Sequence, residues 1–136
     1  MLSAIAAFGF AATSQAETAQ AYQCSVATSR ASGGWVTSEY VFAPGNGGAT
    51  VYDGLIKREF GKPVSAEVKE DTDKRMTLLW EVPLYNSAGQ ATIMRFRAVV
   101  FKQNDKVTVQ ARPAGYKNMF EGRGDCQLVA MKAGKP

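Results

Sequence analysis

Histidine is absent from this chain of 136 residues. It is the commonest general base and metal ligand near neutral pH, so its absence removes both of those roles at once. Cysteine is scarce as well, with only Cys24 and Cys126. No nucleophile has a recognisable base beside it in the sequence. We therefore expect a non-catalytic protein with no catalytic residues, no metal site and no cofactor.

Long hydrophobic runs are also missing. The apolar stretch at residues 2–12 is far shorter than the ~20 residues that a transmembrane helix needs. It is followed by the small-residue sequence TSQA, which is typical of the cleavage site of a secretory signal peptide. We predict a signal peptide at residues 1–16, no transmembrane segment, and a mature protein that begins near Glu17 or, from a second site, near Tyr22.

The two cysteines lie at opposite ends of the predicted mature chain. In an exported protein such a pair is expected to form a disulfide, which persists only in an oxidising compartment. We therefore predict a bond between Cys24 and Cys126 and a periplasmic or secreted protein. Residues 17–136 have the ordinary length of one domain.

The charge balance is mildly basic. The chain carries 16 Lys and Arg against 12 Asp and Glu, a net charge of +4. This value favours contact with anionic surfaces but falls short of the dense positive footprint of a nucleic-acid-binding protein. We expect an unknown protein or anionic ligand as partner, no nucleic acid, and a monomer.

Helical periodicity is lacking, and short segments of alternating apolar and polar residues dominate instead. Turn-forming Gly, Asn, Asp and Pro separate these segments. The pattern predicts strands at residues 22–28, 35–42, 50–56, 65–70, 76–82, 92–101, 106–112 and 126–130.

Two hairpins can be placed in register from their turns. A loop at 87–89, with Gly89 left-handed, predicts the pairs Trp80 with Phe96, Leu78 with Ala98, and Glu81 with Arg95. A two-residue turn at 104–105 predicts the pairs Val100 with Val109, Ala98 with Ala111, and Arg97 with Arg112. Both assignments choose the same inward face for the shared strand, formed by Met94, Phe96, Ala98 and Val100.

These strands predict an all-β fold, a small antiparallel meander. We expect a closed or nearly closed eight-stranded β-barrel, with a two-sheet β-sandwich as the alternative. In the barrel the disulfide would join the first and last strands.

The candidate binding residues are Arg95, Arg97 and Arg112, together with Tyr116 and Phe120. The three arginines share one outer face of neighbouring strands, where their planar guanidinium groups suit an anion or an acidic partner. The alternative is a solvent-facing wall in which Glu81 screens Arg95. Tyr116 and Phe120 belong to a predicted loop at 113–125, which is either a binding loop or a plug for the barrel end.

Two other patterns are weaker candidates. Carboxylates at 67–73 are interleaved with lysine and arginine, which indicates a solvated loop rather than an acid/base pair or a calcium site. The tripeptide Arg123-Gly124-Asp125 spells a cell-adhesion motif, but a match of three residues directly before a structural cysteine is best explained by chance.

The layout of an exported β domain with YQC at 22–24, VYDG at 51–54 and GRGDC at 122–126 resembles that of the bacterial periplasmic inhibitors of c-type lysozyme. The resemblance implies a small β-barrel, in a family that inhibits by inserting a loop into the lysozyme cleft. The family's serine-glycine and tyrosine inhibitory loop is not found here, so no functional residues are carried over.

The sequence therefore favours an exported, non-catalytic binding module for a protein or an anionic ligand, with an inhibitor-like protein as one form of it. The alternative is a carrier that holds a small apolar ligand inside the barrel. Large inward residues such as Trp80 and Phe96 weigh against much free interior volume.

Overall fold

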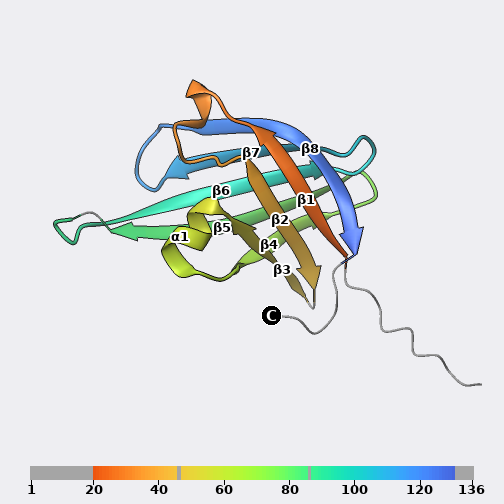
Figure 1. The fold of residues 1–136 in the computed structure, drawn as a ribbon, viewed down its shortest axis with the longest axis horizontal. Coiled ribbons are helices and arrows are strands. Elements are labelled where there is room, and N and C mark those ends of the chain that lie inside the picture. Colours follow the sequence, from red (N-terminus) through yellow and green to blue (C-terminus); the bar gives the residue numbers. More distant parts are fainter. Residues whose placement is uncertain (1–19, 46, 86, 131–136) are drawn as a thin grey trace, which may run out of the picture.

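Eight antiparallel strands follow one another around a closed barrel (Figure 1). The computed structural model describes residues 20–45, 47–85 and 87–130, so the predicted signal peptide at 1–16 lies outside the described residues. The strands are β1 (Gln20–Ala27), β2 (Glu39–Gly45), β3 (Gly48–Asp53), β4 (Val64–Asp71), β5 (Arg75–Tyr85), β6 (Ala91–Phe101), β7 (Lys106–Pro113) and β8 (Phe120–Ala130). The all-β prediction is confirmed, and the barrel rather than the sandwich is correct because β1 pairs with β8.

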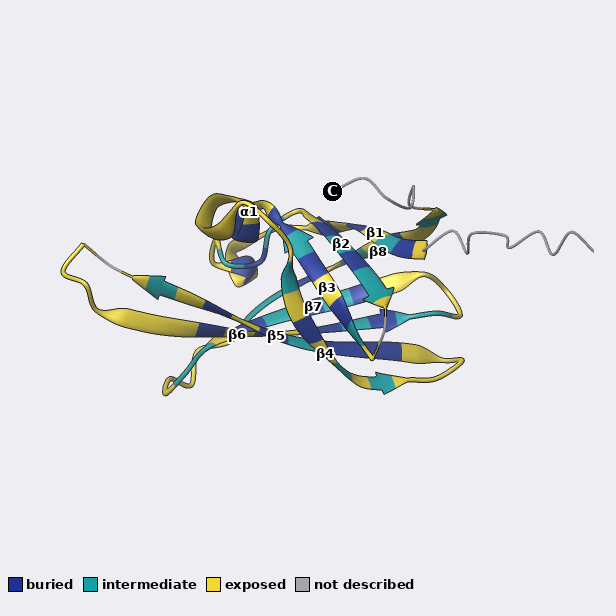
Figure 2. Cartoon of the chain, turned by 90° about the horizontal axis from the view of Figure 1, so that it is seen from below, coloured by how far each residue is buried: buried dark blue, intermediate teal, exposed yellow. Residues whose placement is uncertain are grey.

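The β5–β6 hairpin has the predicted register, in which Trp80 lies opposite Phe96 and Arg95 opposite Glu81. Gly89 has the predicted positive φ, at 79°. Among the described residues, the last cross-strand pair of this hairpin is Tyr85 with Ala91. This hairpin projects beyond the barrel wall, and its tip is exposed (Figure 2).

The β6–β7 register differs from the prediction by two residues. Val100 lies opposite Val107 and Ala98 opposite Val109, so Arg97 faces Gln110, not Arg112. The predicted two-residue turn is wrong because the strands already separate after the pair Phe101 and Lys106. Since side chains alternate with period two, a shift of two keeps every residue on its predicted face.

Aromatic side chains fill the barrel interior between β2, β5 and β6. Tyr40 stacks on Phe42 with ring centroids 5.5 Å apart, and Trp80 stacks on Phe96 at 5.3 Å. Phe42 and Trp80 join the two stacks at 5.8 Å. All four residues are buried, so the interior of this part of the barrel is packed.

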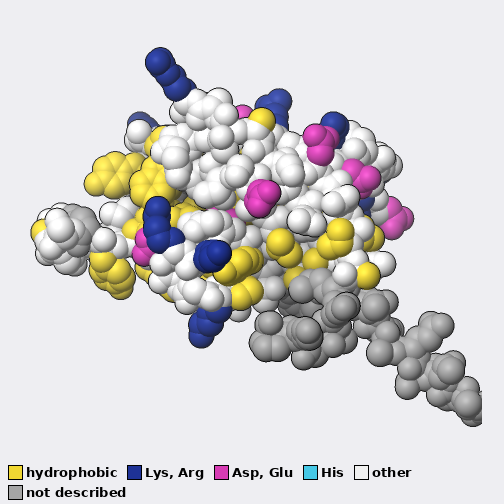
Figure 3. Space-filling model, in the orientation of Figure 1, with side chains coloured by type: hydrophobic (Ala, Val, Ile, Leu, Met, Phe, Trp, Pro, Cys, Tyr) yellow, Lys and Arg dark blue, Asp and Glu magenta, His cyan; other side chains and the backbone are white. Residues whose placement is uncertain are grey.

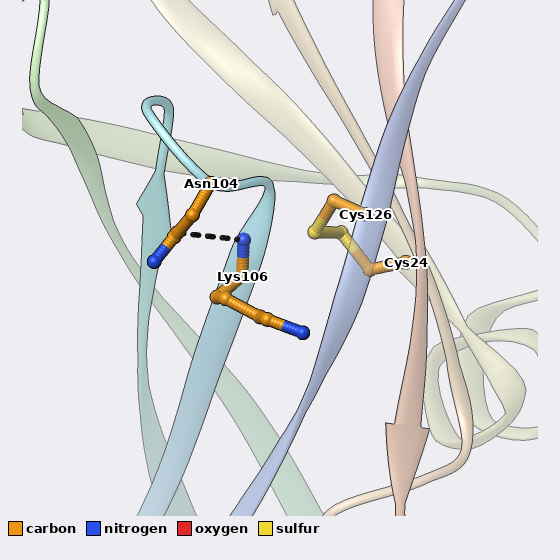
Figure 4. The surroundings of a disulfide bond; sticks show 4 residues. All are labelled: Cys24, Asn104, Lys106 and Cys126. Carbon is orange, nitrogen blue, oxygen red and sulfur yellow. Dashed lines mark hydrogen bonds between the residues drawn. A yellow bond between two sulfur atoms is a disulfide. The ribbon is translucent and has the colours of Figure 1, made fainter.

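The disulfide between Cys24 and Cys126 closes the barrel. The two residues lie directly opposite each other on β1 and β8, as Figure 4 shows. The predicted pairing and its place between the first and last strands are both confirmed. The bond indicates an oxidising environment.

A short helix, α1 (Gly54–Phe60), follows β3 and was not predicted from the sequence. It ends the strand predicted at 50–56 three residues early, because Asp53 caps the helix rather than forming a turn. One carboxylate oxygen of Asp53 accepts the backbone N–H of Ile56 at 2.8 Å. Leu55 and Ile56 are buried, which anchors the helix to the core.

The same carboxylate connects α1 to β2 through a partly buried polar network. Its second oxygen accepts the hydroxyl of Thr37 at 2.6 Å, and the backbone N–H of Thr37 donates to the Tyr40 hydroxyl at 3.0 Å. Burial, reinforced by the charge of Asp53, raises the pKa of Tyr40 well above its ordinary value. The stability gained by keeping this tyrosine neutral is therefore present below pH ~10 and decreases as the pH rises above it.

Replacing Asp53 with alanine is expected to lower the free energy of unfolding by about 2 to 4 kcal/mol. The change removes a helix cap and leaves the half-buried Thr37 hydroxyl and the buried Ile56 N–H without an acceptor. Asp53→Asn should cost less because the amide keeps one carbonyl oxygen. Urea unfolding of both variants provides the measurement, and equal losses for Ala and Asn would contradict the network.

The predicted loop at 113–125 is shorter in the structure, because β8 begins at Phe120. Gly122 and Gly124, which belong to the predicted loop, lie inside the paired strand. A Cβ at Gly124 would lie 1.8 Å from the backbone oxygen of Ser25, and one at Gly122 would lie 2.7 Å from Val26 Cγ1. These glycines permit close approach of β8 to β1.

The predicted strand at 35–42 is displaced along the chain, since β2 runs from Glu39 to Gly45. The residues before it follow a 3-10 turn, η1 (Arg30–Ser32), which the sequence analysis did not predict. The hydroxyl of Ser32 donates to the backbone oxygen of Glu121 at 3.1 Å and so joins η1 to β8.

Candidate functional site

The three candidate arginines lie together on the outer face of β6 and β7. Arg95 and Arg97 are two residues apart on β6, and Arg112 on β7 lies directly opposite Arg95. All three are exposed, while the intervening residues Phe96 and Ala111 point into the core. Strand alternation therefore places the guanidinium groups on one wall.

A shallow pocket of about 210 Å³ lies among these guanidinium groups. Its lining residues are Arg95, Arg97, Gln110, Arg112 and Met119, and we call it the arginine pocket. Gln110 and Met119 were not among the predicted site residues. Met119 enters through the β7–β8 connection, where its sulfur lies 3.6 Å from Nη2 of Arg112.

Two of these arginines have no carboxylate partner in the part of the chain that the structure describes. Among the described residues, no acidic side chain lies within 4.0 Å of Arg97 or Arg112, and Arg95 Nε is 3.9 Å from Glu81 Oε2. Glu121 is occupied elsewhere, because it accepts a hydrogen bond from Gln110 at 3.1 Å and pairs with Arg123 at 3.7 Å. The pocket consequently keeps a net positive charge.

Much of the remaining wall pairs its charges. Glu70 pairs with Arg75 at 2.7 Å across the β4–β5 turn, and Lys102, which follows β6, pairs with Asp71 at the end of β4. The bond to Asp71 raises the pKa of Lys102. Two of the carboxylates at 67–73 thus hold ion pairs, but Glu67, Glu70 and Asp71 lie on strand β4 and not in the predicted loop.

On the face drawn in Figure 3, basic side chains are dispersed among acidic and hydrophobic ones. The arginine pocket differs from this face because three guanidinium groups line one depression.

A second pocket of about 470 Å³ adjoins the first on the same wall. Both pockets include Arg97 in their lining. The second one is lined by Lys69, Glu70, Arg75, Thr77, Arg97, Val99 and Phe101. Thr77 is almost fully buried although it points outward, because larger side chains of the same lining, such as Val99 opposite it, cover it. We call this depression the mixed pocket.

Tyr116 and Phe120 do not line the arginine pocket. Tyr116 is exposed at a turn in which its N–H donates to the oxygen of Pro113 at 3.2 Å. Phe120 is half-buried, packs on the core and covers Gly33, where an added Cβ would lie 2.3 Å from its ring. Phe120 thus packs against the barrel core at the start of β8, and Tyr116 is a separate surface group.

The Arg123-Gly124-Asp125 sequence lies inside β8, paired with β1 on one side and β7 on the other. Asp125 forms an ion pair with Lys106, and Arg123 forms one with Glu121. The tripeptide is thus part of the barrel wall and does not form a loop tip.

Residues 20–45, 47–85 and 87–130 hold neither a metal-binding cluster nor a membrane-spanning helix. This part of the chain has no group of three or more acidic or cysteine side chains arranged to hold a metal. No helix within it is long and apolar enough to span a bilayer.

Comparison of the chain with family models, curated proteins and solved structures finds no match in any of the three. The geometry and charge of the wall formed by β5, β6 and β7 are therefore the features that point to a function.

Proposed function

We propose that this protein is an exported, non-catalytic binding module that holds an anionic ligand or an acidic protein surface in its arginine pocket. The observation that carries the proposal is the group of three arginines around one depression, two of them without a carboxylate partner among the described residues. Guanidinium forks in this arrangement suit carboxylate, phosphate and sulfate groups.

The disulfide supports an exported location, since such bonds persist in the periplasm and outside the cell. The absence of histidine from the chain supports a role in binding rather than catalysis. Tyr40 and Lys102, whose pKa values are raised, belong to structural contacts away from the pocket. An inhibitor-like role would be one instance of the proposal, with an acidic protein as the target.

The packed interior favours this outer site over an apolar-ligand carrier. Tyr40, Phe42, Trp80 and Phe96 occupy the space that an internal ligand would need. Interior cavities of carriers are open and lined by apolar groups. The outer wall instead combines an open depression with unpaired charge.

Substituting Arg97→Gln and Arg112→Gln together is expected to weaken binding of a labelled hexaglutamate peptide by roughly tenfold at low salt. The salt dependence of the affinity should also become less steep, because two charged contacts are lost. The free energy of unfolding should change by less than ~1 kcal/mol, since the residues are exposed. Fluorescence anisotropy at two salt concentrations and urea unfolding provide the measurements.

The matched control is Arg30→Gln with Arg58→Gln, which removes the same charge from exposed positions outside the pocket. If the control weakened binding as much as the pocket variant, net charge alone would explain the affinity and the proposed site would be wrong.

A further inference from the structure

The two pockets lie next to each other along the outer face of β6 and share Arg97, and we call the two together the groove. Arg95, Arg97, Val99 and Phe101 occupy successive outward positions of this strand. Arg97 lies at the junction, because it lines both pockets. Outward positions of a strand repeat every ~6.6 to 6.8 Å, so the groove spans about 20 Å from Arg95 to Phe101.

The character of the groove changes along its length. At the Arg95 end it presents the net positive arginine pocket, with Met119 as its apolar side. At the Phe101 end, Val99 and Phe101 add apolar surface, and Glu70 neutralises Arg75 at 2.7 Å. Lys69 adds one further cation to this lining. A ligand that is charged along its whole length would therefore place anions over apolar surface and beside a carboxylate, which is unfavourable.

An extended peptide has the same repeat as the groove. Its alternate side chains lie ~6.6 to 6.8 Å apart, so those facing the wall can meet successive outward positions of β6. Carboxylates would bind the arginines in a forked geometry, and apolar side chains would cover Val99 and Phe101.

We propose that the groove binds an extended acidic peptide segment of a partner protein, with acidic side chains at two alternate positions followed by apolar side chains at the next two. This inference rests on the proposed function and gives the partner class. A polyanionic glycan would use the arginine pocket without needing the apolar end.

The test compares two labelled seven-residue peptides of identical composition. The patterned peptide has glutamate at positions one and three, leucine at five and seven, and serine elsewhere; the control peptide exchanges the residues at positions three and five. We expect the patterned peptide to bind the full mature protein at least about tenfold more tightly, since only it places both leucines over apolar surface. A sulfated hexasaccharide serves as the glycan probe.

Variants at the apolar end provide the second measurement. Phe101→Ser, or Val99→Ser where the first variant unfolds, should abolish the preference for the patterned peptide and leave hexaglutamate binding unchanged. Tyr85→Ser is the matched control, because this aromatic residue is 71% exposed and lies outside both pockets. It should leave the preference intact.

The outcomes separate this inference from the proposed function. Equal binding of both peptides by the wild type, or tighter binding of the sulfated hexasaccharide, would overturn the peptide groove while the arginine pocket stood. Unchanged affinity in the Arg97→Gln and Arg112→Gln variant would instead overturn the pocket itself.

Discussion

Removing the disulfide by Cys24→Ala with Cys126→Ala is expected to lower the free energy of unfolding by about 4 to 5 kcal/mol. The bond closes a loop with a sequence separation of 102 residues. In the chain-entropy treatment, a loop of ~100 residues corresponds to about 4.7 kcal/mol, because the reduced unfolded chain regains the conformations that the bond excluded. This is a large share of the 5 to 15 kcal/mol typical of a whole domain.

Urea unfolding of the wild type and the double alanine variant provides the measurement. The slope of the free energy against urea should increase in the variant, since an unfolded chain without the cross-link exposes more surface. Refolding should also slow, because the pairing of β1 with β8 joins the most distant strands of the chain. A loss of unfolding free energy below ~1 kcal/mol, with an unchanged urea slope, would contradict this prediction. It would show that cross-strand hydrogen bonds alone hold β1 and β8 together.

Gly124→Ala is expected to disrupt the pairing of β8 with β1 and to lower the free energy of unfolding by at least ~3 kcal/mol. The new Cβ would lie 1.8 Å from the backbone oxygen of Ser25 and 2.7 Å from Cα of Val26. These are backbone atoms, so no side-chain rotation can relieve the contact. Strand β1 would have to move away from β8 where Gly124 pairs with Val26.

Two comparison variants make this prediction specific. Gly45→Ala on β2 should change stability by less than ~1 kcal/mol, because no atom lies within 4 Å of its added Cβ. Gly122→Ala meets the side chains of Val26 and Val36, so Val36→Ala should relieve it in part. Thermal unfolding of all variants is the measurement, and equal stability of Gly124→Ala and Gly45→Ala would contradict the close approach.

The strand pattern could be predicted because alternation records which residues face the core. Trp80 and Phe96 were placed inward by their hairpin register, and the structure confirms it. The turn after Phe101 was predicted too short, yet the faces stayed correct because the register shift is even. The same alternation places the arginines of the pocket on the outer face, so they could be selected from the sequence.

Other features depend on contacts between distant segments, which a local pattern does not contain. Helix α1 has seven residues, too few for a helical period to be visible, and its main signal is Asp53 before two apolar residues. Gly124 was interpreted as a loop glycine because close packing on β1 leaves no local trace. Met119 and Gln110 join the site only through the course of the β7–β8 connection and the true β6–β7 register.

The most direct test of the arginine pocket is NMR observation of the arginine side-chain Nε–Hε groups during titration with hexaglutamate. We expect the signals of Arg95, Arg97 and Arg112 to shift together with one dissociation constant, whereas those of Arg30 and Arg58 should not shift. Shifts of similar size at every arginine, or shifts centred away from these three, would contradict it.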